Sequence, residues 1–165
     1  MEIFNYSNFI KKIVEKAYSE ITKQYSLTNN EIAVISYLAA GNGDTASDIV
    51  NDLLFSKSHV SLSVDSLAKK GIIVKVQDEQ DKKIWHLLLT EKAGPVAERV
   101  FLREKEMEEI FFRGLSEEEK ELFQKLTEKI VSNATENFLL KQRGDEKSRE
   151  DLRRDEERKQ RPKAE

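Results

Sequence analysis

The side chains best suited to chemistry lie in residues 56–62, where hydroxyl, ammonium and imidazole groups alternate with aliphatic ones. Such polar groups can donate hydrogen bonds to phosphate oxygens and to base edges, and an aliphatic side chain can contact the methyl group of thymine. The segment therefore favours contact with nucleic acid. The predicted contacts are Ser56, Lys57, Ser58, His59, Ser61 and Leu62. The alternatives are helix capping for Ser56 and Ser58, and a solvated surface side chain for His59.

A second polar cluster occupies residues 78–83, Asp-Glu-Gln-Asp-Lys-Lys. Lysines next to a narrow minor groove meet a strong negative potential. We therefore add Lys75, Lys82 and Lys83 to the predicted DNA contacts. Asp78 and Asp81 are poor partners for a phosphate, so we expect them to pair with neighbouring basic side chains and hold the shape of this turn. A merely solvated turn is the alternative.

The sequence offers little for catalysis or metal binding. Its two histidines, His59 and His86, have no nucleophile arrangement or glycine-rich phosphate loop nearby, and they lack the paired spacing of a metal site. There is no cysteine, which excludes disulfides and thiol chemistry. We predict no enzyme activity, no cofactor and no metal. Four aromatic residues could line a ligand pocket, with core or interface packing as the alternative: Phe9, Tyr18, Tyr25 and Trp85.

Helices are predicted around these residues from apolar spacing and capping signals. We expect a first helix over residues 4–24 and a second opened by a Thr28–Glu31 capping box and closed by Gly41 and Gly43. A third helix starts with a Thr45–Asp48 cap. A fourth, capped by Ser56 or Ser58, ends at Gly71.

The 78–83 turn lies between two β-rich segments, 72–76 and 84–89, which predicts a hairpin. Thr90 is expected to cap a fifth helix, whose apolar side includes Ala93, Val96, Ala97, Val100, Phe101 and Phe111. A Ser116–Glu119 box opens a sixth, with apolar residues every four positions at Leu122, Leu126, Ile130, Ala134 and Phe138. The predicted fold is mainly α with a small β-hairpin, a winged helix-turn-helix.

Composition sets wider limits. The 165 residues are 38% hydrophobic and 36% charged, with a net charge of -3. No apolar run approaches the ~20 residues that span a bilayer, and the N-terminus lacks a signal-peptide pattern, so we expect a cytoplasmic protein without a membrane partner. Residues 141–165 hold ten Lys/Arg and eight Asp/Glu. We interpret this tail as disordered or as a solvated helical extension, with a DNA-scanning or partner-binding arm as the alternative.

The first helix and the last two have apolar faces that a compact winged unit cannot obviously cover. A two-fold dimer with interleaved terminal helices is the simplest solution, and an intramolecular bundle is the alternative. We therefore predict dimerisation helices in 1–26 and 91–140 and a DNA-binding lobe in 27–90.

Several of these segments, in order and spacing, resemble the multiple-antibiotic-resistance regulator (MarR) family over roughly residues 3–140. The segments are Leu27-Thr28, Thr45-Ala46-Ser47-Asp48-Ile49, Lys57-Ser58-His59-Val60-Ser61, Val64-Asp65-Ser66-Leu67, Lys70-Gly71-Ile72-Ile73, the 78–83 turn, Leu87-Leu88-Leu89-Thr90 and Leu115-Ser116-Glu117-Glu118-Glu119. The resemblance implies an obligate homodimer on a pseudo-palindromic operator, with residues 56–70 as recognition helix and 72–89 as wing. It also implies a repressor, released by a small aromatic or phenolic ligand bound between the dimer helices and the DNA-binding lobe.

The sequence departs from the family pattern in its basic residues. Lys82 and Lys83 stand where arginines are usual, and Leu62 and Ser66 fill further positions where arginine is common. Lysine lacks the planar fork of arginine, so minor-groove contacts should be weaker and the salt dependence shallower. From residue 28 to 95 there are seven Lys/Arg and nine Asp/Glu. The main alternative function is therefore a winged-helix protein-interaction module that no longer binds DNA.

Overall fold

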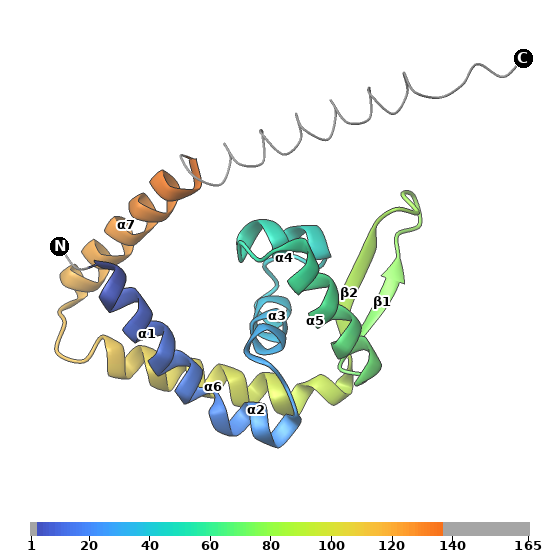
Figure 1. Ribbon diagram of the computed structural model, residues 1–165, viewed down its shortest axis with the longest axis horizontal. Coiled ribbons are helices and arrows are strands. Elements are labelled where there is room, and N and C mark those ends of the chain that lie inside the picture. The colour runs from blue at the N-terminus through green and yellow to red at the C-terminus, as the bar shows by residue number, and fades with distance from the viewer. Residues whose placement is uncertain (1–2, 137–165) are drawn as a thin grey trace, which may run out of the picture. The chain divides into compact units, whose positions relative to one another are not determined.

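The computed structural model describes residues 3–136 and divides the chain into two compact units after Phe111. The first unit holds six α-helices, a short 3-10 helix and a two-stranded sheet, and the described part of the second unit holds one α-helix. The mainly helical fold with a small hairpin is the predicted fold class. Figure 1 traces the elements in chain order.

Two helices replace the single first helix predicted over 4–24. α1 (Ile3–Ala17) ends one residue before Tyr18, and α2 (Ser19–Tyr25) follows it. The Tyr18 hydroxyl donates to Glu104 of a later helix, and Ile21 of α2 is fully buried whereas Ile10 of α1 is exposed. The interruption therefore separates a segment that packs into the core of this unit from one that does not.

Capping boxes open the next two helices, as predicted. At α3 (Asn29–Ala39), the Thr28 hydroxyl accepts from the Glu31 N–H at 3.2 Å and the Glu31 carboxylate accepts from the Thr28 N–H at 2.6 Å. At α4 (Ala46–Asp52), Thr45 and Asp48 make the same pair of bonds. Each box satisfies backbone N–H groups that a helix start leaves without partners.

α5 (Lys57–Lys69) is capped by Ser56, whose hydroxyl accepts from the His59 N–H at 3.2 Å. Of the two serines considered from sequence, Ser56 is therefore the cap, and Ser58 contacts it at 3.0 Å between hydroxyl oxygens. After α5, Gly71 adopts a left-handed φ of 71°, which glycine tolerates without strain. The chain then turns into the sheet.

The hairpin pairs β1 (Ile73–Gln77) with β2 (Trp85–Leu89) in antiparallel register, from Ile73 opposite Leu89 to Gln77 opposite Trp85. Both strands start one residue later than the sequence predicted. A single bridge between Thr45 and His86 adds the segment before α4 to the free edge of β2. Figure 1 shows the hairpin extending as an arm from the end of α5.

A short 3-10 helix, η1 (Glu91–Ala93), leads into α6 (Gly94–Phe111). The prediction that Thr90 caps a helix is wrong, because its hydroxyl donates to the Gly71 carbonyl at 2.7 Å and makes no side-chain cap bond. Thr90 instead joins the start of the hairpin to its end. The hairpin is thereby closed at its base.

One apolar core unites α2, α3, α4, α5, the hairpin and α6. Its most deeply buried members are Ile21, Ile32, Val34, Ile35, Ile49, Val60, Leu67, Ile73, Val96 and Val100. Two helices assigned from sequence to dimerisation, α2 and α6, thus also complete the core of the winged lobe. Burial of this apolar surface is the main stabilising contribution to the unit.

The second unit holds α7 (Glu117–Ala134), opened by the predicted capping box of Ser116 and Glu119. Phe112 and Phe123 pack edge to face with ring centroids 5.5 Å apart. Phe138 and the 141–165 tail lie outside the described residues. Within residues 3–136, no helix has the length and apolar character needed to cross a membrane.

Candidate DNA-binding surface

The N-terminal half of α5 presents one polar, solvent-exposed face. Val60, Val64 and Leu67 point into the core at i, i+4 and i+7, and Ser63 is buried beside them. All six residues predicted from 56–62 are exposed: Ser56, Lys57, Ser58, His59, Ser61 and Leu62. Leu62 is 69% exposed, so this aliphatic side chain is available to a partner.

The turn at the hairpin tip is organised by two carboxylates. Asp78 accepts from the backbone N–H groups of Gln80 at 2.8 Å and Asp81 at 2.7 Å, and Asp81 accepts from the Lys83 N–H at 2.9 Å. Bonds from the Asp81 N–H, from His86 and from the Gln80 N–H lower the pKa of Asp78 below its usual range. The sequence predicted basic side chains as partners, whereas the structure supplies mainly backbone donors, because a tight turn directs its N–H groups inward.

The two lysines of the turn are both exposed. The Lys82 carbonyl accepts from the Gln77 side chain at 2.7 Å. The Lys82 ammonium group donates to the Asp78 carbonyl at 3.2 Å. The Lys83 backbone is fixed by Asp81. The turn therefore holds the backbones of both lysines while their side chains reach solvent.

Lys75 has a different environment from the other two predicted wing lysines. Its ammonium group pairs with the carboxylate of Asp65 on α5 at 2.6 Å. The hydrogen bond and the charge of Lys75 lower the pKa of Asp65. Lys75 thus ties the hairpin to α5 and has part of its charge compensated, so it has less charge to offer a phosphate than Lys83.

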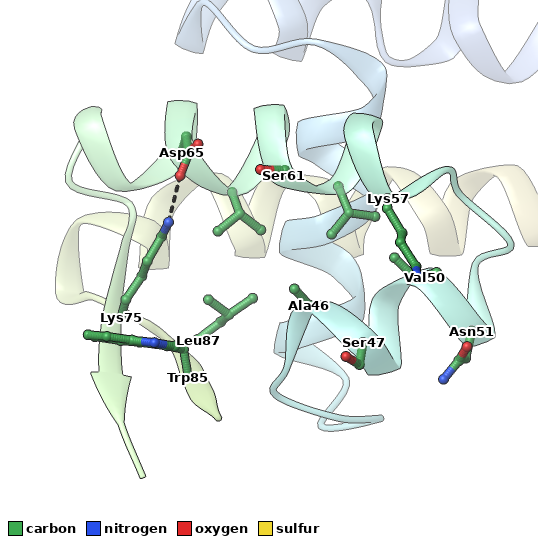
Figure 2. Close-up of a pocket in the computed structure, with 12 residues that line it drawn as sticks. Ala46, Ser47, Val50, Asn51, Lys57, Ser61, Asp65, Lys75, Trp85 and Leu87 are labelled. Atoms are coloured by element: carbon green, nitrogen blue, oxygen red, sulfur yellow. Dashed lines mark hydrogen bonds and ion pairs between the residues drawn. The ribbon is translucent and has the colours of Figure 1, made fainter. Parts of the chain in front are cut away.

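Between α4, α5 and the hairpin lies a pocket of about 620 Å³. Figure 2 shows the Lys75–Asp65 pair and Trp85 at one side of this pocket, and Lys57 with Val50 at the other. Its apolar lining comes from Ala46, Val50, Val60, Val64, Trp85 and Leu87. Trp85, considered from sequence as a pocket residue, lines this one.

α5 is anchored at its C-terminal end by a buried carboxylate. Glu31, 2% exposed, accepts from the Lys70 ammonium at 2.7 Å, and the same ammonium donates to the Ser26 carbonyl. Burial alone would raise the pKa of Glu31, but hydrogen bonds from Lys70, Ser66 and the Thr28 backbone lower it. The start of α3 and the end of α5 are held together by this group.

A second pocket, of about 610 Å³, lies between α1, α3 and α6. Tyr18 and Ser36 both donate to one oxygen of Glu104 there, at 2.9 and 2.8 Å. Burial, with the charge and hydrogen bond of Glu104, raises the pKa of Tyr18, which keeps the phenol protonated. Its other walls include Val14, Tyr37, Leu53 and Phe55.

The remaining aromatic candidates lie elsewhere. Tyr25 lines a smaller pocket of about 300 Å³ beside Lys70 and Lys92. Phe9 is 64% exposed on α1. The four residues that the sequence grouped are therefore spread over separate parts of the first unit.

Three features of the surface escaped sequence reasoning. His86 contacts Asp44 and Asp78, one at each ring nitrogen, at 2.9 and 3.1 Å. The Lys75–Asp65 and Lys70–Glu31 pairs join residues 10 and 39 positions apart. No rule of local spacing predicts such contacts. For His86, the acidic residue Asp78 in the adjoining hairpin turn is the one signal that the sequence offers, once the hairpin itself is predicted.

A helix-turn-helix of α4 and α5, followed by an antiparallel hairpin at its side, defines the class of this unit as a winged helix-turn-helix. A family model described as MarR family matches residues 25–84, which span α3, α4, α5, β1 and the hairpin turn. This segment is therefore similar in sequence to the winged helix-turn-helix of the MarR family.

Part of this chain is also similar to a curated transcriptional regulator. The HTH-type transcriptional regulator SarU of Staphylococcus aureus (strain COL) is 31% identical over 90 residues, covering 50% of this chain and 36% of SarU. The match thus spans little more than a third of that curated relative.

Solved structures extend the likeness of the fold beyond this segment. A MarR family transcriptional regulator from Listeria monocytogenes, complexed with a 26mer DNA, has a TM-score of 0.80 at 19% identity and covers 87% of this chain and 96% of its own. The S. aureus MepR–DNA complex has a TM-score of 0.69 at 27% identity, covering 81% and 99%. A MarR protein from Peptoclostridium difficile has a TM-score of 0.75 at 24% identity, covering 84% and 91%.

Proposed function

We propose that this protein is a dimeric, sequence-specific DNA-binding regulator of transcription and not an enzyme. The observation that carries the proposal is the exposed polar face of α5 beside a hairpin whose turn bears Lys82 and Lys83. A helix of this kind fits a major groove, and a cationic hairpin fits the neighbouring minor groove. Acting on DNA, the protein would work in the cytoplasm.

Different residues on the exposed face of α5 can supply affinity for DNA and specificity for its sequence. Lys57 and the serine hydroxyls can reach phosphates, which position the helix without selecting sequence. His59 and Leu62 carry the groups best suited to contacting base edges. His59 can donate a hydrogen bond from a ring N–H, and Leu62 can contact a thymine methyl group. The DNA complexes solved for the Listeria regulator and for MepR support this use of the fold.

Dimerisation belongs to the same proposal. Large apolar side chains are exposed on α1, including Phe4, Phe9 and Ile10, and on α7, including Leu122, Leu126 and Ile130. Such apolar surface on a protein in water usually marks an interface. A two-fold partner would cover it and would bring two α5 helices to successive half-sites of a palindromic operator.

Repression relieved by a small ligand is the finer part of the proposal. The pocket of about 610 Å³ between α1, α3 and α6 has the size of a small-molecule site, and aromatic rings of Tyr18, Tyr37 and Phe55 line it. α3 also packs on α5, so an occupant that displaced α1 or α6 from α3 would alter the position of the DNA-facing helix. A small aromatic ligand fits this chemistry.

Fluorescence anisotropy with DNA from the region upstream of the protein's own coding sequence tests the function. We expect one dimer per site, tighter binding than to a scrambled duplex, and affinity that falls as salt rises. If the upstream DNA is not preferred, selection of bound fragments from the whole genome replaces it. Failure of that selection to enrich any sequence would contradict the proposal.

A protein-interaction module without DNA binding is the second candidate. The observations that favour it are the Asp65 carboxylate, which compensates Lys75, and the absence of arginine between residues 28 and 95. The same titration separates the two functions. A module of this kind would bind neither duplex at any of the salt concentrations.

A further inference from the structure

His86 of β2 lies between two carboxylates from different segments. Its Nδ1 is 2.9 Å from an oxygen of Asp44, which precedes α4, and its Nε2 is 3.1 Å from an oxygen of Asp78 in the hairpin turn. A neutral imidazole carries one N–H, whereas the imidazolium ion carries two. Both contacts are therefore hydrogen bonds only when His86 is protonated.

The charges around the ring favour that protonated form. Asp44, Asp78 and, from α4, Asp48 are the charged groups in the described residues that act on His86. Hydrogen bonds to Asp44 and then to Asp78 raise the pKa of His86 above its usual value, although burial of the ring acts in the opposite direction. The two carboxylates meet opposite nitrogens and do not converge on one point, so the arrangement is a clamp and not a metal site.

The two partners of His86 also make hydrogen bonds that hold the neighbouring backbone in place. The Asp44 carbonyl accepts from the Leu87 N–H at 2.6 Å, beside the Thr45–His86 bridge, at the entry to α4. The Asp78 carboxylate organises the turn that presents Lys82 and Lys83. His86 thus connects the hairpin tip to the helix-turn-helix across the sheet edge.

We propose that His86 is a positioning residue for DNA binding, whose doubly hydrogen-bonded imidazolium holds the hairpin tip in its DNA-binding orientation. Loss of the proton removes one of the two bonds and leaves a nitrogen lone pair facing a carboxylate. The tip is then released from Asp44 or from the Asp78 turn. The inference rests on the proposed function for its effect on DNA, but the clamp itself can be measured without DNA.

Trp85, the single tryptophan, is the neighbour of His86 in β2 and reports on the free protein. We expect its fluorescence to change in a one-proton transition as the pH rises from about 5.5 to 8.5, a range around and above the ordinary histidine pKa of about 6.5. His86→Gln, which cannot donate to both carboxylates, should abolish the transition. His59→Gln, which changes the only other histidine, should retain it.

Asp44→Asn gives a second test that does not disturb the ring. Removing one negative partner should move the transition to lower pH, and circular dichroism would verify that each variant is folded. A transition absent from the wild type, or unchanged in His86→Gln, would overturn the clamp. A midpoint unaffected by Asp44→Asn would overturn the role of this pair.

The DNA measurement uses anisotropy of the wild-type protein at constant ionic strength, and the same titration of His86→Gln gives the pH dependence contributed by all other groups. We expect affinity for the preferred duplex to fall roughly threefold to tenfold across the fluorescence transition, as expected for a lost hydrogen bond. His86→Gln should bind weakly throughout and should lack this fall in affinity. An equal pH dependence in His86→Gln would overturn the positioning role. A fluorescence transition with no DNA binding at any pH would instead overturn the proposed function.

Discussion

At the scale of single residues, the side chains that we propose to face DNA differ in what they can contribute to binding. Lys83 lies at the exposed turn with its backbone held by Asp81, whereas Lys75 is paired with Asp65. An uncompensated lysine contributes through counterion release, which is the same for every sequence. Lys83 should therefore influence affinity and Lys75 chiefly the attachment of the hairpin to α5.

Lys83→Ala is expected to weaken binding to operator and scrambled DNA by similar factors. The slope of log affinity against log salt should become shallower by about 1 for each lost phosphate contact in the dimer. Anisotropy titrations at four salt concentrations measure this slope. Lys125→Ala, which removes an exposed lysine of α7, should leave it unchanged. An unaltered slope in Lys83→Ala would remove this residue from the DNA contacts.

His59→Ala should show the opposite pattern. The ring is exposed on the first turn of α5, and only its backbone N–H is used by the Ser56 cap, so truncation spares the helix. Loss of a base contact costs about 1–3 kcal/mol at one position of the site. We expect weaker binding to the operator, little change on scrambled DNA, and relaxed preference at one base pair. Equal losses on both duplexes would make His59 a phosphate contact.

At the scale of elements, the sequence predicted most of the helices and the hairpin because their signals are local. The Thr28–Glu31, Thr45–Asp48 and Ser116–Glu119 boxes each link a hydroxyl and a carboxylate three residues apart, and all three form. Thr90 offers only a hydroxyl as a capping signal, without a carboxylate three residues later, and the nearby Gly71 carbonyl accepts a hydrogen bond from this hydroxyl. A local rule fails where a tertiary partner competes for the same group.

The loop between α3 and α4 shows how a correct residue can have an incomplete explanation. The sequence predicts that Gly41 and Gly43 together end a helix. Gly41 has a φ of 70°, which agrees with that role. Gly43 is needed for another reason, since a Cβ there would lie 2.5 Å from the Tyr37 hydroxyl oxygen and 2.8 Å from the Asp48 Cβ. Close approach of this kind depends on packing and cannot be deduced from spacing.

The candidate site divides in the same way. The outward residues of α5 followed from helical periodicity, so their exposure was predictable. The partners of Lys75, His86 and Glu31 were not, since each lies in another element. The sequence does not predict how the elements are attached to each other, and this attachment sets the geometry with which α5 and the hairpin would meet DNA in the proposed complex.

Glu31 provides a test of that attachment. Glu31→Gln should lower the free energy of unfolding by about 1–2 kcal/mol at neutral pH, because the Lys70 ammonium loses a charged, buried acceptor. The pKa of Glu31 is lowered by folding, so its stabilising effect is complete above the ordinary glutamate pKa of about 4.3 and is lost as the pH falls through the lower folded value.

Urea unfolding at several pH values measures both effects. The difference between wild type and Glu31→Gln should be constant near neutral pH and should shrink in acid. Lys69→Met, one residue before Lys70 and exposed, is the matched control and should stay within about 0.5 kcal/mol of wild type. A difference that grew in acid would show that the pKa of Glu31 is raised instead.

At the scale of the whole molecule, the apolar side chains on α7 are the feature that a single chain leaves unexplained. Leu122, Leu126 and Ile130 lie one turn apart on one side of this helix and are each more than half exposed. Capping stabilises the helix but does not cover this side. A second copy of the chain is the occupant we propose.

We expect Leu126→Glu to shift the protein from dimer to monomer, since a carboxylate in an apolar interface is costly to desolvate. Gln124→Glu adds the same charge on another side of α7 and should leave the dimer intact.

Removal of residues 141–165, which are rich in charge and poor in apolar side chains, should also preserve the dimer. Light scattering gives the mass of each variant. A monomer after truncation would place the tail in the interface, and a dimeric Leu126→Glu would direct the search for the interface to α1 and α6. Because a palindromic operator needs two α5 helices at fixed spacing, a monomeric Leu126→Glu should also lose its preference for the operator.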